Sequence, residues 1–100
     1  MKDTALDLDE VLDVLRRFKA ERAYEYGVAR LGVFGSMARG AAREDSDVDI
    51  VVEMNPNLYK RAALKEDLEA QLGRPVDVVR YRRDMKAYLR KQIDNEAVYV

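Results

Sequence analysis

Cysteine and histidine are both absent from the 100-residue sequence. Without cysteine the chain can form neither a disulfide nor a thiolate metal site. Without histidine it can form no imidazole zinc site and no catalysis of the Ser-His or Cys-His kind. Any metal ion must therefore be held by carboxylate oxygens, which favour a hard cation such as magnesium.

Long apolar runs and an excess of one charge are also missing. No apolar run approaches the ~20 residues of a transmembrane helix, and the opening stretch MKDTALDLDE is too acidic and too polar for a signal peptide. The formal net charge is −1, so no overall field attracts nucleic acid or an anionic membrane. We therefore expect a cytoplasmic protein that does not bind membranes.

The residues that are present have the balance of a folded domain. Hydrophobic residues make up 48% of the chain and charged residues 37%, which is typical of a globular protein rather than a disordered one. A chain of this length has room for one compact domain with a modest core, which we assign to residues 1–100.

Hydrophobic periodicity predicts an alternation of helices and strands. Helices are expected over residues 7–26, 56–72 and 83–93, with a helical turn or two over 37–42. Strands are expected over residues 29–34, 47–52 and 76–79, and residues 97–100 form a short edge strand or a packed terminus. Asn55 is the predicted N-cap of the second helix and Pro56 its first residue. The alternation predicts an α/β (α+β) fold, a sheet covered by helices.

The most informative stretch is residues 31–54, LGVFGSMARGAAREDSDVDIVVEM. Gly35 and Ser36 end the first predicted strand, ten residues separate Ser36 from Asp47, and Asp49 follows two positions later. Because side chains on a strand alternate between faces, Asp47 and Asp49 share one face at a spacing of about 6.6–6.8 Å.

A third aspartate, Asp77, stands among valines in the third predicted strand. If that strand pairs with the second, three carboxylates converge. Two unit charges about 4 Å apart repel by about 4 kcal/mol at an effective dielectric of about 20, so such a cluster needs compensation. Two divalent ions would provide it, and two ions also serve phosphoryl or nucleotidyl transfer.

The Gly-Ser turn has the properties of a phosphate site. A turn that leads into a helix presents backbone N–H groups and a positive dipole end to phosphate, and Gly35 lets the backbone come close. Ser36 adds a hydroxyl donor, and Arg39, one turn later, could reach a triphosphate. Each feature alone also has a structural interpretation, as a turn, an edge-strand position (Asp77) or a solvated side chain (Arg39). Their conjunction is rare by chance and is what phosphoryl or nucleotidyl transfer requires.

In these residues the chain resembles the minimal nucleotidyltransferases, the MNT family of antitoxins within the polymerase-beta-like nucleotidyltransferase superfamily. The matching positions are Gly35, Ser36, Arg39, Gly40, Ser46, Asp47, Asp49 and Asp77. The resemblance implies the polymerase-beta-like palm, in which helices cover a small mixed sheet.

The resemblance also implies an activity and roles for these residues. Asp47, Asp49 and Asp77 would be catalytic and hold two magnesium ions, with Asp77 helping to deprotonate the acceptor hydroxyl. Gly35 and Ser36 would hold the nucleotide, which is ATP. Members of the family pair with HEPN ribonuclease toxins and transfer AMP from ATP onto a toxin tyrosine. We therefore expect an antitoxin that neutralises a HEPN toxin by AMPylation.

Two other interpretations stay open. The chain could neutralise the toxin by covering it, because it lacks the acceptor domain of larger relatives. It could also modify a small molecule or an RNA 3′ end. The near-zero net charge disfavours RNA, since phosphate contacts supply most non-specific affinity. A local basic patch at residues 80–83 with Lys86, Arg90 and Lys91 favours an RNA acceptor. Nucleotide selectivity, the acceptor hydroxyl and the stoichiometry with the partner have no signal in the sequence.

Overall fold

The computed structural model describes residues 6–43 and 45–100. Helices and strands alternate along the chain, which confirms the predicted order of elements. They are α1 (Leu8–Tyr26), β1 (Val28–Phe34), α2 (Gly35–Ala38), β2 (Val48–Met54), α3 (Leu58–Leu72), β3 (Val76–Arg80), α4 (Ala87–Glu96) and β4 (Val98–Tyr99).

Helix α1 begins and ends at local sequence signals. The Asp7 carboxylate accepts a hydrogen bond from the Glu10 backbone N–H at 2.9 Å, and the Glu10 side chain accepts one from Asp7 at 3.1 Å. This reciprocal capping satisfies two N–H groups that have no partner within the helix. Gly27, with φ of 70°, ends the helix. No described helix, α1 included, has the length and apolar character needed to cross a membrane.

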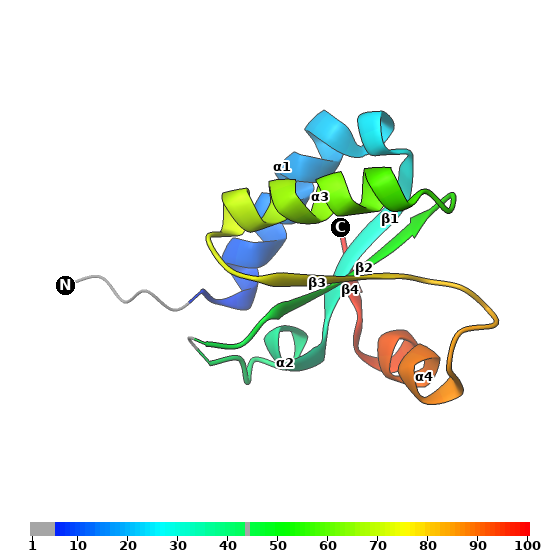
Figure 1. The fold of residues 1–100 in the computed structure, drawn as a ribbon. Helices are drawn as coiled ribbons and strands as arrows, with labels where there is room; N and C mark the ends of the chain where they lie inside the picture. The colour runs from blue at the N-terminus through cyan, green and yellow to red at the C-terminus, as the bar shows by residue number, and fades with distance from the viewer. Residues whose placement is uncertain (1–5, 44) are drawn as a thin grey trace.

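The four strands form one mixed sheet in the order β3-β2-β1-β4. Strand β1 is antiparallel to both β2 and β4, whereas β2 and β3 are parallel. A parallel pair needs a crossover connection, which α3 provides here. Figure 1 shows α1 and α3 on one face of the sheet and α2 and α4 on the other. The mixed sheet covered by helices is therefore confirmed.

Both faces of the sheet bury apolar side chains. On the face covered by α1 and α3, Ile50 of β2 packs into one cluster with Leu64 and Leu68, and all three are fully buried. On the other face, Val51 packs with Phe34 and with Ile93 of α4. Burying a leucine or isoleucine contributes about 1.5–3 kcal/mol, so both layers hold the sheet in place.

Two predicted helix starts are wrong. Helix α3 is capped by Asn57, whose side chain accepts from the Lys60 N–H at 3.0 Å, so neither Asn55 nor Pro56 has its predicted role. Asparagine is an equally good cap at either position, and local signals do not distinguish the two. Helix α4 begins at Ala87 rather than at residue 83, because residues 82–85 form a turn closed by a Met85 N–H bond to the Arg82 carbonyl.

Two elements next to the predicted site also differ from the prediction. Helix α2 is a single turn, Gly35–Ala38, rather than a helix over residues 37–42, since Gly40 takes φ of 72° shortly after it. Strand β2 begins at Val48, so Asp47 lies just before the strand instead of inside it.

Candidate active site

Predicted site residues meet where β1 ends and where β2 and β3 begin. Asp49 of β2 is in register with Phe34 of β1 on one side and with Asp77 of β3 on the other. Neighbouring strands lie about 4.8 Å apart, and residues in register point to the same face. The structure therefore brings Asp49 and Asp77 together, as the sequence predicts for paired strands, while the exposed Asp47 adjoins them along the chain.

Gly35 lies directly against the Asp49 carboxylate. Its φ of 75° belongs to the left-handed region that favours glycine, and a Cβ at this position would overlap Oδ2 of Asp49. The half-buried Ser36 follows in the one-turn helix α2. A single turn carries little helix dipole, so what this turn can offer phosphate is backbone N–H groups and the Ser36 hydroxyl.

The electrostatics of Asp49 reflect its neighbours. Burial raises the pKa of the Asp49 carboxyl above its ordinary value, and the nearby Asp77 and Asp47 raise it further. Arg39 acts in the opposite direction and lowers it. The ionised form of Asp49 is therefore disfavoured in the fold, and a cation beside these carboxylates would relieve that penalty.

Asp49 and Asp77 have the oxygen donors that a magnesium site requires. Among residues 6–43 and 45–100, no group of three or more carboxylates forms a complete site for a metal ion. Asp49 and Asp77 are nevertheless adjacent donors of hard oxygen ligands. Magnesium is usually bound by one or two carboxylates together with substrate phosphates, rather than by a cage made only of protein groups. The donor set at the start of β2 and β3 meets that requirement.

Arg39 is held beside the site by an acid that the sequence did not single out. Its Nη1 lies 2.9 Å from Oε1 of Glu96, so the pair joins α2 to the end of α4. The Arg39 side chain is half exposed, and Glu96 also raises the pKa of Asp49. No spacing pattern links two residues so far apart in the chain, so sequence reasoning could not find this pair.

A second missed residue, Arg74, braces the segment that leads to Asp47. Its Nη2 donates to the carbonyl of Arg43 at 2.5 Å and to that of Ser46 at 2.9 Å. The Ser46 hydroxyl in turn accepts from the Arg43 N–H at 3.0 Å. These hydrogen bonds, together with that from the Ser46 N–H to the Arg43 carbonyl at 3.1 Å, hold the turn before β2, although Arg74 lies well beyond it in the sequence.

Comparisons with known proteins agree on one family. Residues 13–100 match the nucleotidyltransferase domain family. The chain is 44% identical over 97 residues to the protein adenylyltransferase MntA of Thermococcus cleftensis, a match that covers 95% of this chain and 97% of that protein.

Two solved structures share the fold. One, provisionally named a minimal nucleotidyltransferase, is 39% identical with a TM-score of 0.76, covering 96% of this chain and 98% of that one. The other is a chain from a complex of tri-AMPylated Shewanella oneidensis HEPN toxin with an MNT antitoxin. It has a TM-score of 0.57 at 20% identity, covers 97% of this chain and 71% of that one, and shows the fold alone. Given this fold and the match over residues 13–100, the chain belongs to the nucleotidyltransferase domain family of nucleotidyl-transferring enzymes.

Proposed function

We propose that this chain is a magnesium-dependent adenylyltransferase that moves AMP from ATP onto a tyrosine hydroxyl of a HEPN toxin, and so acts as its antitoxin. The observation that carries the proposal is the register pairing of Asp49 with Asp77 beside the close approach of Gly35. The 44% identical relative is named a protein adenylyltransferase, and the fold is shared with a chain from an AMPylated-toxin complex. The cytoplasm stays the compartment that we expect.

The proposed step is an in-line substitution at phosphorus. The acceptor oxygen attacks the α-phosphorus of ATP, a bond forms between them, the bond to the β-phosphate oxygen breaks, and pyrophosphate leaves. Asp77, exposed on the edge strand, accepts the hydroxyl proton. Asp47, Asp49 and Asp77 would hold two magnesium ions, which when bound neutralise charge on the phosphates and the leaving group.

The turn after β1 is the proposed triphosphate site. Gly35 lets phosphate approach the backbone because no Cβ is present, and the half-buried Ser36 supplies a hydroxyl donor. Arg39 lies on the same turn and is half exposed, so its guanidinium can exchange Glu96 for a phosphate oxygen. An arginine at this position would stabilise the negative charge of the pyrophosphate leaving group.

The test is the intact mass of a HEPN partner after incubation with this chain, ATP and magnesium. We expect the partner to gain one or more AMP units, and expect EDTA or the double variant Asp47→Asn/Asp49→Asn to abolish the gain. Asp13→Asn is the matched control, because Asp13 is exposed on α1 and its carboxylate pairs there with Arg16. A mass gain that survives the double variant would contradict the assigned site.

A second candidate function is neutralisation by binding alone. A surface that covers a partner needs exposed apolar side chains, and four large ones are exposed among the described residues. They are Tyr24, Leu58, Tyr59 and Tyr88, of which Tyr24 is fully exposed and Tyr59 is 90% exposed. If the double variant still protects cells from the toxin at an unchanged protein level, this second function is correct. Loss of protection with undiminished binding of the toxin supports the enzyme.

A further inference from the structure

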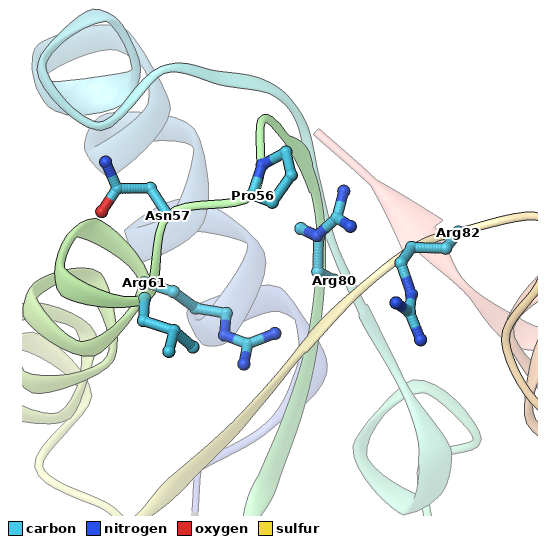
Figure 2. Close-up of a pocket in the computed structure, with 6 residues that line it drawn as sticks. Pro56, Asn57, Arg61, Arg80 and Arg82 are labelled. Atoms are coloured by element: carbon cyan, nitrogen blue, oxygen red, sulfur yellow. The ribbon is translucent and has the colours of Figure 1, made fainter.

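Three adjoining hollows follow the free edge of β3, with volumes of about 280, 480 and 270 Å³. Figure 2 shows the first hollow, with Arg61 reaching in from α3 and with Arg80 and Arg82 at the end of β3 and just beyond it. The second hollow shares these three arginines, and the third shares Arg61 and ends at Asp77. Together they form one channel, here called the β3-edge groove, that leads to the candidate active site.

The positive charge of the β3-edge groove is poorly compensated. The Arg61 guanidinium makes no hydrogen bond or ion pair with any residue that the structure describes. Arg80 donates to the backbone carbonyl of Met54 at 3.1 Å and forms no ion pair with an acid of residues 6–43 or 45–100. Arg82 lies 3.7 Å from Asp84, and both side chains are exposed. A partner for this groove must therefore be acidic.

No described strand pairs with the outer edge of β3, where the Val76 N–H donates to Oε2 of Glu69 at 2.9 Å. Strand β3 ends the sheet, and Tyr81, the residue just after β3, donates its N–H to the Val52 carbonyl of β2 at 2.8 Å. Alternate residues of a strand direct their backbone groups to opposite sides, so Val78 and Arg80 direct theirs away from β2. An extended peptide can add to such an edge through main-chain hydrogen bonds.

The groove also has apolar walls. Val78 and Val79 line it from the strand, and Met85 and Leu89 line it from the α4 side. Leu58, at its other end, is 73% exposed. Alternating apolar and acidic side chains of a peptide would meet both kinds of wall, whereas a nucleic acid has no groups that match a strand edge. These features favour a polypeptide over RNA.

We propose that the β3-edge groove binds an extended acidic segment of the acceptor protein, which adds as a strand beside β3 and pairs its carboxylates with Arg61, Arg80 and Arg82. The role of the segment rests on the proposed function, since the groove ends at Asp77 and directs the bound hydroxyl toward it.

Fluorescence anisotropy of a labelled synthetic peptide tests the groove without any reaction. The probe is a short peptide of alternating glutamate and valine that carries one tyrosine. The charge reversal Arg61→Glu/Arg82→Glu should weaken its binding by about tenfold or more, because each reversal turns an attraction into a repulsion. Arg16→Glu/Arg17→Glu is the control for charge alone, since both residues are exposed on α1 and the net charge changes by the same amount. Replacing the glutamates of the peptide with glutamine should have the same effect as the charge reversal.

Equal binding by the charge-reversed and unchanged proteins overturns the proposal. So does tighter, arginine-dependent binding of single-stranded oligouridine, which would make the groove a nucleic-acid site. The AMP transfer assay separates this inference from the proposed function. Peptide binding that depends on the arginines, without transfer to any acceptor, leaves the groove intact and refutes the activity. Transfer to the HEPN partner with an unchanged KM in Arg61→Glu/Arg82→Glu refutes the groove and leaves the activity intact.

Discussion

Gly35→Ala measures the close contact between the turn after β1 and the Asp49 carboxylate. Gly35 has φ of 75°, and an added Cβ would overlap Oδ2 of Asp49. Gly73, at the end of α3, has φ of 69°, but a Cβ there meets nothing within 4 Å. Gly73→Ala therefore reports the backbone cost alone and is the matched control.

The two substitutions should lower the free energy of unfolding by different amounts, because only Gly35→Ala creates an overlap with Asp49. A left-handed backbone costs a residue other than glycine about 1–2 kcal/mol. Both alanine substitutions lower the free energy of unfolding by this amount. Forcing an extra methyl group into a packed site costs about 1–3 kcal/mol more. Only Gly35→Ala carries this additional loss of stability. We expect a loss of about 2–5 kcal/mol in the free energy of unfolding for Gly35→Ala, and about 1–2 kcal/mol for Gly73→Ala.

Urea unfolding followed by circular dichroism measures both losses, provided that the slope against urea stays constant. The double variant Asp49→Ala/Gly35→Ala isolates the contact between the new methyl group and the Asp49 carboxylate. In an Asp49→Ala background the carboxylate is gone, and the remaining Cβ of residue 49 lies at an ordinary 3.4 Å from the new methyl group. Gly35→Ala should then cost no more than Gly73→Ala.

Two results would refute this reasoning. The first is an equal loss of stability for Gly35→Ala and Gly73→Ala in the unchanged protein. The second is a Gly35→Ala penalty that persists in full after Asp49 has been replaced. Either result would mean that the turn does not press against the carboxylate.

Two further predictions concern stability. Because the pKa of Asp49 is raised above 3.8, its contribution to stability is present at acid pH and is lost as pH rises through the raised pKa. Asp49→Asn should therefore melt higher than the unchanged protein at neutral pH, and thermal melts at a series of pH values should show this advantage vanish toward acid pH. At Gly32 an added Cβ would lie 2.8 Å from Cδ1 of Tyr99, so Gly32→Ala should displace β4 and lower the free energy of unfolding by about 1–3 kcal/mol in urea titrations.

Local patterns in the sequence were sufficient to predict most of the helices and strands. The leucines of α3 recur every four residues, and Leu64 and Leu68 are fully buried as that stripe predicts. Gly27 and Gly73 end their helices with φ of 70° and 69°, and glycine is a common signal for a helix end. These features depend on neighbours a few residues away, so they can be read without the fold.

Element boundaries were less predictable because several residues satisfy the same local rule. Two asparagines flank Pro56, and Asn57 is the one that caps α3. Similarly, Met85 shares the apolar pattern of α4 but lies before its first turn, where it packs beside Val51 and Ile93. Tertiary contacts decided which local signal was used.

The candidate site likewise combines features that the sequence predicts with features that depend on the tertiary structure. The sequence by itself determined the Gly-Ser turn and the spacing of Asp47 and Asp49, since these lie in one short stretch. Only the tertiary structure decided that β3 pairs parallel to β2, which sets Asp77 beside Asp49. It also decided the Arg39–Glu96 pair and the gathering of three arginines along the β3 edge. Such contacts join residues that are distant in the chain, and their formation depends on the packing of every element between them.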